Sequence, residues 1–185
     1  MSLADYSLVE LSASIDLSTF DCGDQDINEF LKDDALNYQK DRMANTYLFI
    51  DDDSNEIVAF FSISNDCLND LGEDSGYTNK IWNKFHRKAE IPNKKRIRSY
   101  PAIKIGRLGV CKKLQGNGLA YELMDFIKGY SVLDLKPACR LLLVDAYNKE
   151  KQIKFYSRNG FLFLLDSDEH DEKRIMYYNL QRLED

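Results

Sequence analysis

Histidine and cysteine are scarce in this chain of 185 residues, which has two histidines and four cysteines. Cys22, Cys67, Cys111 and Cys139 form no Cys-x-x-Cys pair, and neither histidine lies at ligand spacing from a cysteine. A protein zinc site needs several such ligands at short spacing, so the sequence predicts no metal site. Isolated cysteines without a secretion signal indicate reduced thiols. We therefore expect a cytoplasmic protein.

Long apolar runs and an excess of positive charge are absent as well. No stretch approaches the roughly 20 apolar residues of a membrane-spanning helix, and residues 1–16 lack the basic and apolar regions of a signal peptide. The net charge of -6 and the pI of about 5.0 argue against general affinity for nucleic acid or anionic membranes. The length and the 44% hydrophobic content fit one domain over residues 1–185.

Charge is distributed unevenly along the chain. Residues 1–79 carry a net charge of -15, residues 80–107 carry +9, and residues 108–185 are balanced. A basic stretch of this kind is either a solvated face or a docking surface for a polyanion. The sequence leaves both interpretations open.

Apolar periodicity predicts one mixed sheet with helices on its faces. Helices are expected at 25–44, 78–90, 119–130 and 149–160, and strands at 46–50, 57–63, 100–111, 140–146, 161–165 and 174–180. Asp24 or Asp26 can cap the first helix, and His86 is expected to be exposed on the second. The apolar alternation changes phase near Gly106–Arg107, which indicates a β-bulge in that strand.

The stretch LGVCKKLQGNGLAYELM, residues 108–124, places two glycines between a strand and a helix. It fits neither a Walker loop, which needs Lys-Ser/Thr after the glycine, nor a dinucleotide fingerprint, because Tyr121 stands where Gly or Ala is required. Successive N–H groups in a glycine turn at a helix start can still bind phosphate oxygens. A bulged strand before the turn can pair with an amide-bearing ligand. Coenzyme A carries both a pyrophosphate and an arm with amides, so it fits this segment. The alternative is that the glycines form an ordinary turn that binds no ligand.

Three motifs resemble those of the GNAT superfamily of acetyltransferases. Gln115-Gly116-Asn117-Gly118-Leu119-Ala120 resembles its (Gln/Arg)-x-x-Gly-x-(Gly/Ala) motif, and Arg107-Leu108-Gly109-Val110 is similar to its pantetheine-binding strand. Phe155-Tyr156-Ser157-Arg158-Asn159-Gly160-Phe161 is similar to its Phe-Tyr-x-x-x-Gly-Phe signature. The resemblance implies an α/β (α+β) fold. Its central mixed sheet is mostly antiparallel, has six to seven strands flanked by helices, and splays after a bulged fourth strand.

The resemblance is nearest to the GNAT branch that includes toxins of toxin–antitoxin pairs, which acetylate the amino group of aminoacyl-tRNA. It is carried by Phe20-Asp21-Cys22-Gly23, Asn28-Glu29-Phe30-Leu31, Ala35, Tyr100-Pro101 and Val144-Asp145-Ala146. The chain departs from that branch in its net negative charge. It also has Lys149 where Asn is usual, with Asn148 one position earlier, and Gln152 where Ala is usual.

The resemblance also implies acetyl-CoA as cosubstrate and a set of residues that bind it. Strand backbone would hold the pantetheine arm, N–H groups of the glycine turn would hold the pyrophosphate, and the Tyr156 hydroxyl would protonate the departing thiolate. The implied cofactor-binding residues are Leu108, Gly109, Val110, Gln115, Gly116, Asn117, Gly118, Leu119, Ala120 and Asn148. Asn148 could equally cap the helix beginning at Lys149. From its spacing alone, Tyr156 would be expected to pack in the core. No general base is identified.

The expected function is an acetyl-CoA-dependent N-acetyltransferase acting on a primary amine of a small molecule or protein, because the overall charge argues against RNA. Acetylation of aminoacyl-tRNA is the alternative within this class, with residues 80–107 as the RNA surface. A non-catalytic CoA-binding regulatory module is the alternative of another class. The sequence permits a homodimer and leaves an antitoxin partner undetermined.

Overall fold

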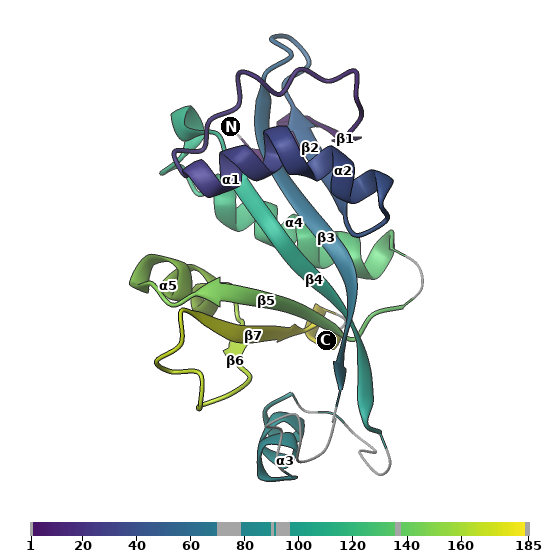
Figure 1. Cartoon of the computed structure of the whole chain (residues 1–185), viewed down its shortest axis with the longest axis vertical. Helices are drawn as coiled ribbons and strands as arrows, with labels where there is room; N and C mark the ends of the chain where they lie inside the picture. The colour runs from purple at the N-terminus through teal and green to yellow at the C-terminus, as the bar shows by residue number, and fades with distance from the viewer. Residues whose placement is uncertain (1, 70–78, 90, 92–96, 136–137, 184–185) are drawn as a thin grey trace. The chain divides into compact units, whose positions relative to one another are not determined.

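The computed structural model describes residues 2–69, 79–89, 91, 97–135 and 138–183. These residues form a seven-stranded sheet in the order β1-β2-β3-β4-β5-β7-β6 (Figure 1). The strands are β1 Ser7–Glu10, β2 Asn45–Ile50, β3 Ile57–Asn69, β4 Ser99–Val110, β5 Leu141–Tyr147, β6 Leu162–Phe163 and β7 Lys173–Asn179. The helices are α1 Gln25–Glu29, α2 Ala35–Lys40, α3 Asn79–Lys88, α4 Leu119–Leu133 and α5 Glu150–Arg158. The predicted mixed, mostly antiparallel sheet is confirmed, with β4 and β5 as a parallel pair.

The described chain divides into two compact units, one of residues 1–65 and 105–128 and the other of residues 66–104 and 129–185. A single domain over the whole chain stays a prediction. No described helix combines the length and the hydrophobicity needed to cross a membrane. Within the same residues, His, Cys, Asp and Glu side chains form no group of three that could hold a metal ion.

In the first unit, β1, β2 and β3 pair antiparallel, which confirms the predicted hairpin and adds a strand that the sequence pattern did not predict. The predicted 25–44 helix is interrupted by a π-helical turn at Phe30–Asp34 and ends at Lys40. Both Phe30 and Leu31 are buried there, and the wider turn directs these adjacent side chains to the core. Asp24 caps α1, as predicted, by accepting a 3.3 Å hydrogen bond from the Ile27 N–H.

In the second unit, α3 packs through an aromatic face made of Trp82, Phe85 and His86. The prediction that His86 is exposed is wrong, because the ring is only 3% exposed and its Nε2 lies 2.9 Å from the Tyr100 hydroxyl. The imidazole occupies the apolar side of the helix because a buried hydroxyl satisfies its nitrogen.

β5 lies between β4 and β7, and its first four residues are buried, as expected for a continuously apolar strand. The strand predicted at 161–165 is reduced to Leu162–Phe163. β4 pairs with β5 over Ala102–Lys104, so residues 105–110 lie beyond that ladder. The bulge near Gly106–Arg107 stays a prediction.

Candidate active site

The glycine turn before α4 leaves a row of backbone N–H groups unused. Gly116 and Gly118 have φ of 86° and 85°, which is the left-handed region that favours glycine. The Tyr121 N–H donates to the Gly118 carbonyl at 2.8 Å. The N–H groups of residues 116–120 have no protein acceptor in the described part of the chain. They lie at the positive end of a 15-residue helix and can bind an anion.

The space around the turn is open, since a Cβ added at Gly116 or Gly118 would meet no heavy atom within 4 Å. The first turn of α4 is held from its side by Glu122, whose carboxylate accepts hydrogen bonds from Leu3 N at 2.7 Å and Ser2 Oγ at 2.8 Å. These two bonds hold the pKa of the Glu122 carboxyl below its usual value. The N-terminus of the chain therefore fastens the helix that opens the turn.

Gln115 anchors the other side of the turn. Its Nε2 donates to the carbonyl oxygens of Cys22 at 2.7 Å and Val110 at 2.9 Å. Both amide hydrogens are thus committed to protein acceptors, and the side chain joins the turn to the end of β4. Its predicted contact with acetyl-CoA stays a prediction, and this bracing contact was not foreseen from the motif.

β4 approaches the first-unit core closely at Gly109. A Cβ there would lie 2.9 Å from Phe60 Cε1 and 3.2 Å from Ile27 Cγ2, so packing alone excludes a larger residue. The Cys111 N–H, just past the strand, donates to the Val58 carbonyl at 2.8 Å. The predicted pantetheine-binding segment at residues 108–110 is therefore positioned by the strand behind it.

The second unit carries Tyr156, on α5. Its side chain is partly exposed, and its ring meets Phe155 and Phe161 edge-on, with centroids 5.2 Å and 5.5 Å apart. The helix ends at Arg158 with Asn159 as its C-cap, and Gly160 follows with φ of 81°. Aromatic packing therefore fixes the ring without burying it fully. Its predicted role as general acid stays a prediction.

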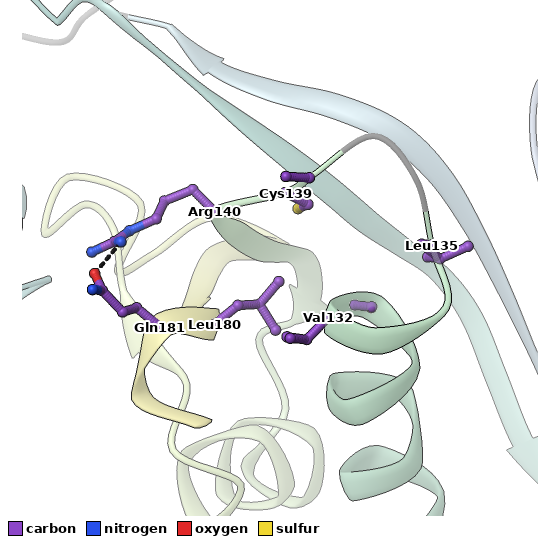
Figure 2. A pocket seen from close by; sticks show the side chains of 8 residues that line it. Val132, Leu135, Cys139, Arg140, Leu180 and Gln181 are labelled. Carbon is purple, nitrogen blue, oxygen red and sulfur yellow. Dashed lines mark hydrogen bonds between the residues drawn. The ribbon is translucent and has the colours of Figure 1, made fainter. Parts of the chain in front are cut away.

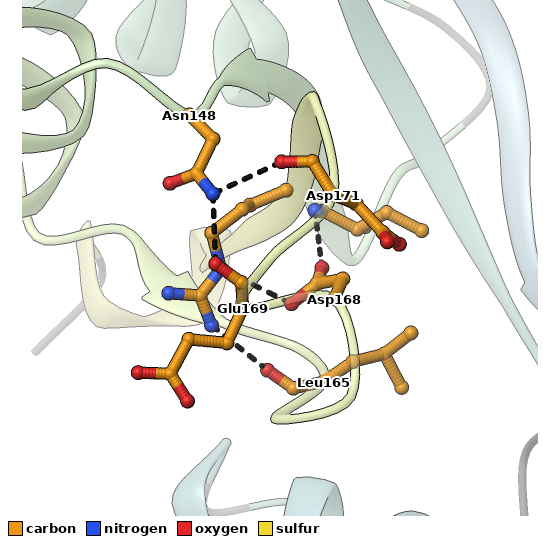
Figure 3. Close-up of polar contacts among 7 residues, drawn as sticks. Asn148, Leu165, Asp168, Glu169 and Asp171 are labelled. Atoms are coloured by element: carbon orange, nitrogen blue, oxygen red, sulfur yellow. Dashed lines mark hydrogen bonds and ion pairs between the residues drawn. The ribbon is translucent and has the colours of Figure 1, made fainter.

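Asn148 joins the start of α5 to the β6–β7 loop (Figure 3). Its Nδ2 donates to the carbonyl oxygens of Glu169 at 2.8 Å and Asp171 at 3.0 Å, and its backbone N–H donates to the Glu172 carbonyl at 2.8 Å. The prediction that Asn148 caps α5 is wrong, because the N-cap is Lys149 and the Asn148 amide bonds the loop instead. The predicted contact between Asn148 and CoA stays a prediction.

The β6–β7 loop is itself held by a buried ion pair. Arg174 Nε lies 3.1 Å from Asp168 Oδ1, and Asp168 Oδ2 accepts from the Ile175 N–H at 2.9 Å. The Arg174 guanidinium also lies 3.7 Å from the centroid of the Phe163 ring. Sequence reasoning missed this pair, since Asp168 stands among several acidic residues with no pattern that marks it as buried.

A cavity of about 200 Å³ lies in the second unit, at the start of β5 (Figure 2). Its wall includes Val132, Leu135, Cys139, Arg140, Leu180 and Gln181. Arg140 donates a hydrogen bond to Gln181, and burial raises the pKa of the Cys139 thiol. None of the predicted site residues lines this cavity.

Comparison with solved structures gives one consistent fold, although no family model matches the chain. AtaT complexed with acetyl-methionyl-tRNAfMet is 21% identical, with 97% of this chain and 98% of that one covered and a TM-score of 0.69. AtaTR bound with acetyl-CoA is 20% identical, with 98% and 97% covered and a TM-score of 0.69. A tyrosine-to-phenylalanine mutant of KacT is 22% identical, with 97% and 98% covered and a TM-score of 0.67.

AtaT is a toxin that has also been solved bound to the C-terminus of the antitoxin AtaR. At these identities the likeness establishes the fold, and it extends over nearly the whole chain. The fold expected from the resemblance to toxin-like GNAT proteins is therefore confirmed.

Proposed function

We propose that this chain transfers the acetyl group of acetyl-CoA to the amino group of an aminoacyl-tRNA. The observation that carries the proposal is the likeness, over 97% of the chain, to AtaT complexed with acetyl-methionyl-tRNAfMet. Overall charge had favoured a small-molecule or protein amine. The comparison supports the tRNA alternative better, and the distribution of charge, described below, is compatible with it.

The geometry of the first unit supports acetyl-CoA as the donor. The unused N–H groups of residues 116–120 can bind the pyrophosphate, with the helix dipole of α4 behind them. The backbone of Leu108, Gly109 and Val110 would hold the amides of the pantetheine arm. Gly109 and Gln115 position these two segments through protein contacts.

In the proposed reaction the neutral amine nitrogen attacks the thioester carbonyl carbon, a C–N bond forms and the C–S bond breaks. The leaving thiolate takes a proton, which the Tyr156 hydroxyl would donate. The nitrogen loses one proton as the amide forms, so solvent exchange restores Tyr156 with no net change in protons. The side chain of Tyr156 is partly exposed.

The basic segment at residues 80–107 supports an RNA acceptor. Lys84, Lys104 and Arg107 of this segment pair with Asp166, Asp145 and Asp26. Among the described residues, four other cations of the segment are exposed and form no ion pair, namely Lys80, Arg87, Lys88 and Arg98. Three of them lie on α3, where they can contact phosphates of an acceptor stem.

The deciding experiment is transfer of labelled acetyl from acetyl-CoA to a pool of charged tRNA. We expect label in the tRNA fraction with the wild-type protein, strong loss with Tyr156→Phe, and normal transfer with Tyr38→Phe, which changes an exposed tyrosine that is not among the proposed site residues. Equal transfer by a folded Tyr156→Phe protein would refute the acid role. Label only in small amines or proteins would instead support acetyl transfer to a small-molecule or protein amine. Saturable CoA binding without thiol release would indicate a regulatory binding module.

A protein antitoxin belongs to the same proposal, because AtaT has been solved with AtaR bound. We expect the cognate antitoxin to abolish acetyl transfer when it is added in stoichiometric amount. Unchanged acetyl transfer by a stable complex would show that the antitoxin binds the protein without inhibiting it.

A further inference from the structure

The Tyr147 ring at the end of β5 has two ammonium groups close to it. Lys173 Nζ lies 4.7 Å from the ring centroid and Lys149 Nζ lies 5.5 Å from it. Tyr147 is the last residue of β5, and Lys173, the first residue of β7, is its direct cross-strand partner. Lys149 is the N-cap of α5, the helix that carries Tyr156. All three residues belong to the second unit.

The backbone beneath this cluster is firmly held. The Lys149 N–H donates to the Tyr147 carbonyl at 2.7 Å, and the intervening Asn148 makes three hydrogen bonds to carbonyl oxygens of the β6–β7 loop. The loop is fixed in turn by the ion pair between Asp168 and Arg174. The ring and its two lysines therefore project from a rigid turn.

Both lysines are available to an external anion. Their side chains are exposed, and neither forms an ion pair with a carboxylate of the described chain, although Glu169, Asp171 and Glu172 lie in the adjoining loop. A cation–π contact at an exposed site is weak. An ammonium group can therefore leave the ring for a phosphate oxygen and uncover an aromatic face.

A partly exposed aromatic ring flanked by two unpaired cations has the chemistry of a site for unpaired nucleotides. Bases that are not in a helix stack on aromatic side chains, while lysines contact the adjoining phosphates. An acidic peptide would use the two charges and leave the ring without a role. The combination therefore favours single-stranded nucleic acid.

We propose that Tyr147, Lys149 and Lys173 form a binding site for the single-stranded 3′ end of the acceptor RNA. The proposal rests on the proposed function and adds a contact to it, at the start of the helix that carries Tyr156. The α3 cations would then contact the double-stranded stem, and this site the unpaired nucleotides next to the aminoacyl group.

Kinetics with aminoacyl-tRNA test the site within the reaction. We expect the double variant Lys149→Gln/Lys173→Gln to raise the KM for aminoacyl-tRNA about tenfold while kcat and the KM for acetyl-CoA stay near the wild-type values. Lys154→Gln, which removes an exposed, unpaired charge from the same helix, is the matched control and leaves all three constants unchanged. A KM for aminoacyl-tRNA equal to that of the control would overturn the site while leaving the proposed function intact. A rise confined to the KM for acetyl-CoA would assign the lysines to the donor instead and also overturn it.

Direct binding tests the site without catalysis. A short fluorescent single-stranded RNA ending in CCA is titrated against each protein and followed by anisotropy. We expect Tyr147→Ala to weaken binding about tenfold and Tyr147→Phe to restore it, since the ring provides the stacking face. The double lysine variant is expected to lower the slope of log affinity against log salt by about 1.4. If the wild-type protein acetylates no tRNA, this measurement still decides the site, and variants that bind the RNA like the wild-type protein would refute it.

Discussion

The side-chain amide of Gln115 donates a 2.9 Å hydrogen bond to the carbonyl oxygen of Val110, five residues earlier in the chain. The same nitrogen donates to the Cys22 carbonyl at 2.7 Å. One side chain thus fastens the glycine turn both to the strand proposed to hold pantetheine and to the loop before α1. The position of the anion-binding N–H groups depends on this bracing contact.

Gln115→Glu tests the contact with little change in shape. The substitution replaces the donating nitrogen with an oxygen, which would face two carbonyl oxygens left without a donor. We expect the free energy of unfolding to fall by about 1–3 kcal/mol and the KM for acetyl-CoA to rise. Urea unfolding and steady-state kinetics measure the two effects. Wild-type values for both would show that the brace has no energetic role.

The glycine turn yields a second prediction, which tests the positive φ of Gly118 separately from steric clashes. Gly118→Ala creates no clash, but the positive φ would cost about 1–2 kcal/mol for a residue with a Cβ. We expect weaker acetyl-CoA binding, because the turn relaxes and its N–H groups move. Gly118→Asn is expected to retain more binding, since Asn tolerates this conformation.

Gly129→Ala is the matched control for that substitution. Gly129 also has open space around it, but it lies within α4 and has no positive φ. Alanine there should stabilise the protein by about 0.5–1 kcal/mol without altering acetyl-CoA binding. Calorimetry and isothermal titration distinguish the two variants, and equal behaviour of both would contradict the proposed role of the turn.

The sequence predicted the sheet and most helices because apolar periodicity and turn residues report on burial over several consecutive residues. It failed where tertiary contacts decide. The four residues of β1 carry too short a pattern to be recognised, and the π-helical turn at Phe30–Asp34 depends on how two adjacent apolar residues reach the core. His86 is buried because Tyr100, on another element, supplies its hydrogen-bond partner.

The candidate site could likewise be predicted only in part from the sequence. The glycine motif predicted the turn and the helix that follows it. Contacts that join distant parts of the chain, such as those of Asn148 with Glu169 and Asp171, depend on loop conformation and leave no spacing signal. The cations around Tyr147 come together only because the β5–β7 register sets Lys173 opposite that residue.

Glu122 provides a prediction for acid pH. Hydrogen bonds from Leu3 and Ser2 lower the pKa of its carboxyl below the usual 4.5. A lowered pKa in the folded state means that the contribution to stability is present above pH 4.5 and is lost as the pH falls through the folded-state pKa. We expect Glu122→Gln to have a lower Tm than the wild-type protein at neutral pH and a difference that shrinks in acid. A difference that stays constant with pH would show that the charge is not involved.

Tyr177 provides the corresponding prediction for alkaline pH. Its ring is 1% exposed, its hydroxyl has no hydrogen-bond partner among the described residues, and burial raises its pKa from 10.0 to about 12. The unfolded chain therefore loses this proton first, so the contribution to stability is full below pH 10 and falls as the pH rises toward 12.

Tyr177→Phe removes both the ionisation and the unsatisfied hydroxyl. We expect its free energy of unfolding to exceed the wild-type value by about 1 kcal/mol at neutral pH and by more above pH 10. Urea unfolding across this range measures the difference, and a variant less stable than the wild-type protein at neutral pH would show that the hydroxyl has a partner in solution.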